Sequence, residues 1–107
     1  VDDDERFLST LNVILNSKYE TTCCDSARLA RELISLKLYD LVISDIQMPH
    51  LSGLDLLSWT REKRPDQKVV LMTGFGKILE TQEAHEMGAA GFLAKPFLKE
   101  DLINLVQ

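Results

Sequence analysis

The chain has 107 residues, and its 12 Lys and Arg against 17 Asp and Glu give a net charge of -5 at pH 7. That length suits a single domain with one core, spanning residues 1–107. The acidic balance argues against direct binding to nucleic acid or an anionic membrane, since both require a basic surface. No apolar run approaches the roughly 20 residues of a membrane span, and an acidic N-terminus is not typical of a signal peptide, so we expect a cytoplasmic location.

In the first half of the chain, helical and strand periodicities alternate. After the acidic start, apolar spacings of three and four predict a helix of about three turns, carrying Phe7, Leu8, Leu11, Ile14 and Leu15. Residues 19–24 predict a strand, and Asp25 or Ser26 then caps a second helix. The inner face of that helix carries Ala27, Ala30, Leu33 and Ile34. Residues 41–44 are a buried apolar strand that leads directly into Asp45.

The second half repeats this alternation. A third helix begins at Ser52-Gly53 and ends before Pro65, because proline cannot continue a helix. Residues 69–72 predict a strand, and Gly74 and Gly76 mark the turn into a fourth helix that Gly88 stops. Residues 91–94 predict the last strand, and a final helix carries Leu98, Leu102, Ile103 and Val106.

Two adjacent cysteines, Cys23 and Cys24, fall in the strand predicted at residues 19–24. Neighbouring side chains of a strand point to opposite faces, so we do not expect a disulfide between them. The sequence favours free thiols in a reducing compartment.

Strands that alternate with helices indicate an α/β fold whose parallel sheet is covered on both faces. The flavodoxin-like, doubly wound strand order 2-1-3-4-5 fits, but it requires a central first strand before Asp2, where only Val1 precedes. We therefore expect that first strand to be trimmed from this sequence. We expect about five apolar residues upstream of Val1 and further residues after Gln107.

Charged and hydroxyl side chains follow the predicted strands. Asp2 and Asp3 come after the first strand, Asp45 after the third, Thr73 after the fourth and Lys95 after the fifth. Because the carboxyl ends of parallel strands share one edge of the sheet, we expect these side chains to converge. Crowded carboxylates repel one another and favour a bound divalent cation, Mg²⁺ or Mn²⁺, which prefers oxygen ligands.

Several motifs together resemble the receiver domain of two-component response regulators, which has the CheY-like form of the flavodoxin-like fold. They are the run Val1-Asp2-Asp3-Asp4-Glu5, the block 45–49 (Asp-Ile-Gln-Met-Pro) with Gly53 eight residues after Asp45, Thr73-Gly74, and Lys95-Pro96-Phe97. The resemblance covers nearly the whole chain and keeps the spacing of the family. It implies that Asp45 accepts a phosphoryl group.

The resemblance also implies roles for the neighbouring residues. Asp3, Asp45 and the backbone carbonyl of Gln47 would hold the metal, with Asp2 acting through a bound water. Lys95 would bind a phosphoryl oxygen, Thr73 would move inward to bind another, and Phe92 would be the aromatic switch. The residues expected to support the surrounding loops are Pro49, Gly53, Gly74 and Pro96. Many members of the family carry alanine where this chain has Gly74, which could loosen the loop of Thr73.

By the same resemblance the domain is a signalling switch and not a conventional turnover enzyme. Its partners would be a sensor histidine kinase or a histidine phosphotransfer protein, and an output domain outside this chain. A homodimer could form through the fourth helix, fifth strand and fifth helix. His50 and His85 are expected to be surface residues without a role.

Alternatives remain open for the site and for the function. The run Asp2-Asp3-Asp4 could be a solvated helix start, which best describes Asp4 and Glu5. The domain could also be a receiver-like module that signals by contact without being phosphorylated. A phosphatase of the haloacid dehalogenase type fits less well, because that class has Asp-x-Asp after its first strand and this chain has Gln47 in the second acidic position of its candidate block.

Overall fold

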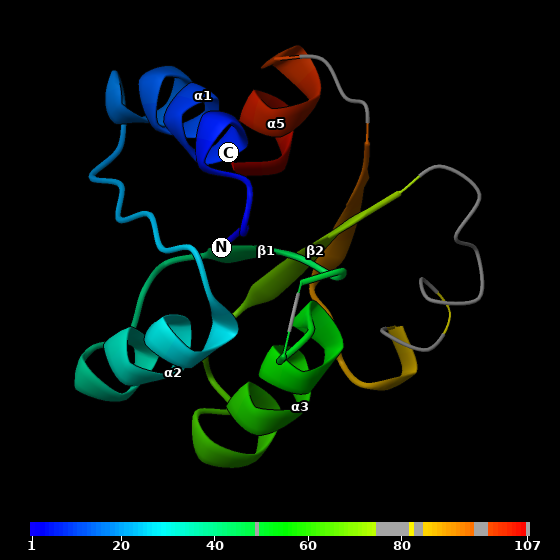
Figure 1. The fold of residues 1–107 in the computed structure, drawn as a ribbon. Coiled ribbons are helices and arrows are strands. Elements are labelled where there is room, and N and C mark those ends of the chain that lie inside the picture. The colour runs from blue at the N-terminus through cyan, green and yellow to red at the C-terminus, as the bar shows by residue number, and fades with distance from the viewer. Residues whose placement is uncertain (49, 75–81, 83–84, 96–98, 107) are drawn as a thin grey trace.

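The computed structural model describes residues 1–48, 50–74, 82, 85–95 and 99–106 of the chain. The helices there are α1 (Glu5–Asn16), α2 (Ala27–Leu36), α3 (Gly53–Lys63) and α5 (Lys99–Val106), and the strands are β1 (Val42–Asp45), β2 (Val69–Thr73) and β3 (Gly91–Ala94). The strands pair in parallel in the order β1-β2-β3. As Figure 1 shows, α1 and α5 cover one face of this sheet, and α2 and α3 cover the other. The predicted α/β layering is confirmed.

Polar side chains fix where the helices begin. Asp4 caps α1 by accepting hydrogen bonds from the backbone N–H groups of Arg6 and Phe7. Ser26, and not Asp25, caps α2. A reciprocal capping box between Ser52 and Asp55 starts α3. Each cap satisfies backbone donors that the first turn of a helix leaves without partners.

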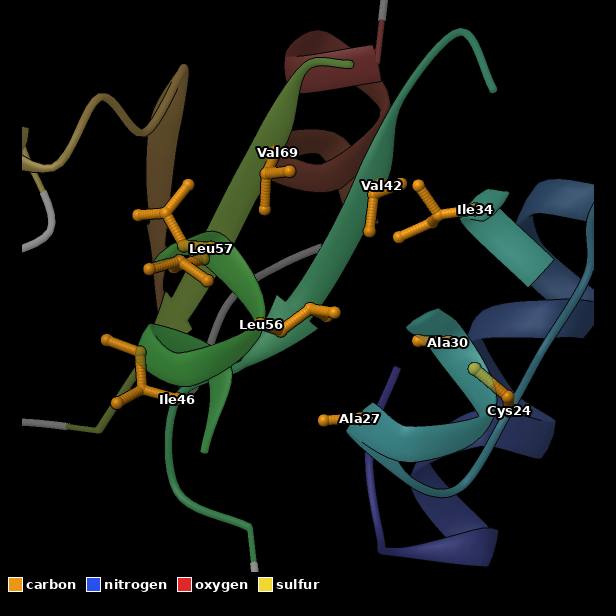
Figure 2. Packing of buried hydrophobic residues seen from close by; sticks show 10 residues of the cluster. Cys24, Ala27, Ala30, Ile34, Val42, Ile46, Leu56, Leu57 and Val69 are labelled. Carbon is orange, nitrogen blue, oxygen red and sulfur yellow. The ribbon is translucent and has the colours of Figure 1, made fainter. Parts of the chain in front are cut away.

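Two apolar clusters hold the layers together. The larger lies between the sheet and helices α2 and α3, and Figure 2 shows side chains of both helices directed toward β1 and β2. Its buried members are Cys24, Ala27, Ala30, Ile34, Val42, Ile46, Leu56, Leu57, Val69 and Leu71. The smaller cluster, on the face of α1 and α5, contains Leu11, Met72, Leu93 and Leu102. Leu71 and Met72 thus reach opposite clusters, as alternation along β2 requires.

The strand predicted at residues 19–24 is wrong, because that segment is irregular. The backbone of Val1 and Asp2 lies between it and β1: the Val1 carbonyl accepts from Asp45 N–H (2.9 Å), and Asp2 N–H donates to the Cys24 carbonyl (3.2 Å). A strand needs a continuous ladder of hydrogen bonds with a neighbour, and two residues do not supply one. A groove of about 260 Å³ between the segment and β1 is lined by Leu15, Leu41 and Ile43, among others. The strand expected upstream of Val1 stays a prediction.

Most of the fourth predicted helix lies outside the described residues. The glycine predicted to end it is described: Gly88 has φ +95° and its N–H donates to the His85 carbonyl. Cys23 is exposed and Cys24 is buried, and both are free thiols, although the strand from which their opposite orientation was predicted is not formed. Leu98 also lies outside the described part. None of the described helices has the length and apolar character needed to cross a bilayer.

Gln67 is a buried polar side chain that joins two loops on the amino side of the sheet. Only 1% of its surface is exposed. Its Oε1 accepts from Tyr39 N–H (2.8 Å), and its Nε2 donates to the carbonyls of Tyr39 (2.9 Å) and Lys68 (3.0 Å). The side-chain amide therefore pairs with the Tyr39 backbone as a neighbouring strand would.

Replacing Gln67 with leucine is expected to lower the free energy of unfolding by about 2 kcal/mol, because it leaves the N–H and carbonyl of Tyr39 without their buried partner. Urea unfolding monitored by circular dichroism measures the change. Asp66→Ala, at the exposed neighbouring position, is the control and should stay within about 0.5 kcal/mol of the parent. Equal stability of Gln67→Leu and the parent would contradict this role.

Candidate functional site

The ends of the strands bring the predicted site residues to one edge of the sheet. Asp45 is the last residue of β1, Thr73 is the last residue of β2, and Lys95 directly follows β3. Carboxylate oxygens of Asp2, Asp3 and Asp45 all lie within 4.8 Å of one another. Residues from positions 2 to 95 therefore meet in one acidic pocket beside the Lys95 ammonium, as expected for the carboxyl ends of parallel strands.

Asp2 is the buried anchor of this pocket, with 1% of its surface exposed. Its Oδ1 accepts from Asp4 N–H (3.0 Å), and its Oδ2 accepts from the Lys95 ammonium (2.8 Å). The solvated helix start considered for this run is therefore wrong for Asp2 and confirmed for Asp4, which is exposed and caps α1. Because both oxygens of Asp2 already have donors, Asp2 is held in a fixed orientation.

Lys95 lies among three groups. Its Nζ is 2.8 Å from Asp2 Oδ2, 3.4 Å from Asp45 Oδ2 and 4.2 Å from the centre of the Phe7 ring. Burial disfavours the ammonium, but the hydrogen bond to Asp2 and the charge of Asp45 outweigh it and raise the pKa of Lys95 above its ordinary value. The lysine is thus a fixed cation beside the Asp45 carboxylate.

Burial is the main reason why the pKa of Asp45 is raised. The positive charge of Lys95 acts in the opposite direction, the negative charge of Asp2 adds to the rise, and hydrogen bonds from Lys95 and from the Gln47 backbone reduce it. The Asp45 side chain keeps 15% of its surface exposed, so it is reachable from solvent. The result is an accessible carboxylate whose charge the fold only partly compensates.

The raised pKa of Asp45 makes folding stability depend on pH. The folded state binds this proton at a higher pH than the unfolded state, so the contribution of Asp45 to stability is fully present below the unfolded pKa and falls as pH rises through the folded pKa. We expect Asp45→Asn to be more stable than the parent at pH 7, with the difference shrinking toward pH 3. Thermal unfolding in EDTA from pH 3 to 8 tests this. The control, Asp66→Asn, removes a carboxylate at an exposed loop position outside the pocket. A parent as stable as Asp45→Asn at every pH would contradict the prediction.

Gly53 leaves room for the backbone beneath Asp45. A Cβ at this position would overlap the carbonyl oxygen of Asp45 and lie 2.8 Å from Ile46 Cα. The Gly53 N–H donates to the Ile46 carbonyl (2.7 Å), which ties the start of α3 to the end of β1. The sequence predicted support of the loop by Gly53, and the close approach of two backbone segments supplies the reason.

The acidic pocket suits a small divalent cation. Magnesium bonds to oxygen at about 2.1 Å, so two direct ligands lie at most about 4.2 Å apart. Carboxylate oxygens within 4.8 Å of one another are close to that limit, and Asp3 is exposed while Asp45 is half-buried. The residues therefore fit a magnesium ion that has some ligands from protein and others from water.

The remaining predicted site residues differ in how far they are buried. Thr73 is buried at the end of β2, next to the strand of Asp45. Phe92 is half-buried in β3 and packs against the larger cluster, with its ring centre 6.5 Å from that of His85. Gln47 and Gly74 are exposed. Pro49 and Pro96 lie outside the described residues.

Sequence reasoning missed the contact of Phe7 with Lys95. It assigned Phe7 only to the apolar face of α1, and no signal in the sequence separates this residue from Leu8 or Leu11. Contact with His85 was likewise not expected for Phe92. Phe7 and Lys95 are remote in the chain, and His85 and Phe92 lie on either side of Gly88, so periodicity along one element reports neither contact.

Known proteins are similar to this chain in sequence. A profile of the response regulator receiver domain matches residues 1–107. The chain is 36% identical over 107 residues to the response regulator protein FleR of Pseudomonas aeruginosa, covering 99% of this chain and 23% of that protein. It is 31% identical over 108 residues to the transcriptional regulatory protein FixJ of Bradyrhizobium diazoefficiens, covering 100% of this chain and 53% of that protein. The chain thus spans 23% of the length of FleR and 53% of the length of FixJ.

A solved structure gives the same result for the fold. The response regulator receiver domain protein of Clostridium thermocellum superposes with a TM-score of 0.92 at 28% identity, covering 98% of this chain and 86% of that one. The predicted flavodoxin-like fold is confirmed by this similarity together with the parallel sheet. With its full length matched by the family profile, the chain belongs to the response regulator receiver domain family.

Proposed function

We propose that this chain is a phosphorylation-controlled signalling switch in which Asp45 accepts the phosphoryl group. The observation that carries the proposal is the position of Asp45: its Oδ2 lies 3.4 Å from the Lys95 ammonium and its carboxylate lies in the acidic pocket with Asp2 and Asp3. Membership of the receiver family supports it. A partly exposed carboxylate beside a fixed cation is a suitable acceptor.

The chemistry is an in-line phosphoryl transfer. A carboxylate oxygen of Asp45 attacks the phosphorus of a phosphohistidine, forming an O–P bond as the P–N bond breaks, and the released imidazole takes the bonding electron pair and a proton from water. Asp45 must be deprotonated for this attack. Burial raises its pKa, and the positive charge of Lys95 acts against that rise and favours the carboxylate. Lys95 also faces the negative charge that spreads over the phosphoryl oxygens.

We assign the metal site to Asp3, Asp45 and the backbone carbonyl of Gln47, with Asp2 acting through a bound water. The engagement of both Asp2 oxygens by Asp4 N–H and Lys95 favours this indirect role. When bound, Mg²⁺, or Mn²⁺ in its place, would neutralise charge on the phosphoryl oxygens. Asp3, the exposed member of the set, is free to turn toward an ion without breaking a buried contact.

We infer that phosphorylation of Asp45 changes the rest of the domain by repositioning Thr73 and Phe92. Thr73 would donate its hydroxyl to a phosphoryl oxygen, and Phe92 would change its packing between the larger cluster and His85. A phosphoryl group can drive such a change only by bonding better in one of two packed states. The surface it would alter consists of the fourth predicted helix, β3 and α5, which is the proposed surface for a homodimer.

The loop support predicted for Pro49, Gly74 and Pro96 is part of the same proposal, because these positions flank Gln47, Thr73 and Lys95. Receiver domains are signalling proteins, and we propose that this one promotes its own modification without being a turnover enzyme. Its proposed location is the cytoplasm, and its proposed partners are a sensor histidine kinase or a histidine phosphotransfer protein and an output domain. FleR and FixJ, which this chain matches in part, are regulators by name.

Incubation with acetyl phosphate and Mg²⁺, followed by whole-protein mass spectrometry, tests the proposal. We expect one phosphoryl group on the parent, none on Asp45→Asn and an undiminished amount on Asp66→Asn. No addition to the parent would instead favour a module that signals by contact alone. Equal addition to Asp45→Asn would place the modification elsewhere.

A further inference from the structure

Phe7 lies between the smaller apolar cluster and the acidic pocket. Its side chain is half-buried and packs against the cluster that contains Leu11, Met72 and Leu102. The Lys95 ammonium lies over the same ring, 4.2 Å from its centre. A cation within about 6 Å of the face of an aromatic ring is attracted by the negative charge on that face. Phe7 therefore contacts the functional lysine directly.

The turn that contains Asp4 fixes two of the groups that contact Lys95, the Asp2 carboxylate and the Phe7 ring. The Asp4 side chain accepts from Phe7 N–H (3.3 Å), and Asp4 N–H donates to Asp2 Oδ1 (3.0 Å). The cap of α1 thus fixes the buried carboxylate and the aromatic ring relative to each other. Lys95 reaches this turn from β3 and contacts both groups.

The Phe7 ring covers one side of the Lys95 ammonium without adding a negative charge, as a third carboxylate would. Asp2 and Asp45 attract the ammonium at 2.8 Å and 3.4 Å, and the ring occupies a further side from which water would otherwise solvate it. The Lys95 side chain keeps 27% of its surface exposed, so its flexible stem could otherwise turn toward solvent. Because the ring is neutral, it holds the ammonium near Asp45 without adding a competing negative charge.

We propose that Phe7 is a positioning residue for Lys95: its ring holds the ammonium at the point from which it can meet a phosphoryl oxygen on Asp45. This inference rests on the function proposed above. An aliphatic side chain at position 7 would fill the same cluster but would leave the ammonium free to move away from Asp45.

The test is phosphorylation of Phe7→Leu, Phe7→Tyr and a protein with pentafluorophenylalanine at position 7. With saturating acetyl phosphate and Mg²⁺, we expect leucine to lower the rate constant about three- to tenfold, with the half-saturating donor concentration unchanged. Tyrosine should restore the rate, because it keeps the negative ring face. Pentafluorophenylalanine keeps the size of the ring but removes that negative face, so it should behave like leucine even if leucine itself impairs folding.

A double-mutant cycle with Lys95→Met separates positioning from packing. In the Lys95→Met background, Phe7→Leu should have no further effect on the rate, because the ammonium that the ring positions is gone. The packing control is Ile14→Val. Ile14 lies on the same helix and packs against the same cluster, so this variant should keep the parent rate. Equal rates for the parent and Phe7→Leu, or the same loss in both Lys95 backgrounds, would overturn the inference.

The contact can also be measured without phosphorylation. In the NMR spectrum of the unmodified protein, the ring of Phe7 should displace the Hε resonances of Lys95, and Phe7→Leu should abolish that displacement while Phe7→Tyr retains it. An undisplaced Lys95 in the parent would overturn the inference. A displaced Lys95 in a protein that acetyl phosphate does not modify would instead refute the proposed function alone.

Discussion

Gly53→Ala is expected to lower the free energy of unfolding by about 3 kcal/mol and to slow phosphorylation of Asp45. The added Cβ would overlap the Asp45 carbonyl oxygen and crowd Ile46 Cα at 2.8 Å. Both neighbours are backbone atoms, which relieve a clash only if β1 and α3 separate. That separation would lengthen the bond from Gly53 N–H to the Ile46 carbonyl and move the phosphoacceptor.

Gly91→Ala is the matched control for this prediction. A Cβ there would lie 3.7 Å from Val70 Cγ2 and 3.8 Å from Leu105 Cδ1, which are ordinary contacts. We expect its free energy of unfolding to match or exceed that of the parent by up to about 1 kcal/mol, since alanine restricts the unfolded chain. Urea unfolding measures both variants, and a Gly53→Ala as stable as Gly91→Ala would show that the close approach is not rigid.

Lys95→Met is expected to lower the rate constant of phosphorylation about 100-fold at saturating acetyl phosphate. The Lys95 ammonium is the cation nearest Asp45 among the described side chains, at 3.4 Å. Removing a fixed charge beside the transferring phosphoryl group is expected to slow the reaction about as much as removing one hydrogen-bond donor from an oxyanion hole. The same substitution removes the donor from Asp2 Oδ2, so we also expect about 3 kcal/mol less stability in EDTA, where a buried carboxylate is left unpaired.

Magnesium should reverse part of the loss of stability in Lys95→Met but not the loss of rate. An ion near Asp2 compensates its charge in the folded state, whereas the missing contact to the phosphoryl oxygen stays missing. Lys68→Met, at an exposed position before β2, serves as the control and should match the parent in both measurements. A Lys95→Met phosphorylated within threefold of the parent rate would contradict the role of the lysine.

The elements that sequence predicted best carry their signal locally. Apolar spacing predicted α1 and α2, Ser26 was one of two caps predicted for α2, and β3 was predicted at its observed bounds, because each pattern depends on residues within one or two turns. The segment at residues 19–24 has a suitable strand pattern but is irregular. A strand is defined by its neighbour, and the hydrogen-bond partners of this segment are not encoded in the segment itself.

The site was predictable to the extent that topology alone determines it. Parallel strands bring their carboxyl ends together, so Asp2, Asp45 and Lys95 converge whatever the details of packing. The contacts of Phe7 with Lys95 and of Gln67 with Tyr39 depend on how side chains of different elements fit against each other. Such contacts have no period or motif, so they were found only in the structure.

The most direct test of the account is to identify the residue that carries the phosphoryl group. After incubation with acetyl phosphate and Mg²⁺, borohydride reduces an aspartyl phosphate to homoserine, and peptide mass spectrometry locates it. The account predicts homoserine at position 45 and at no other acidic residue. Homoserine at Asp2 or Asp3, with Asp45 intact, would contradict it.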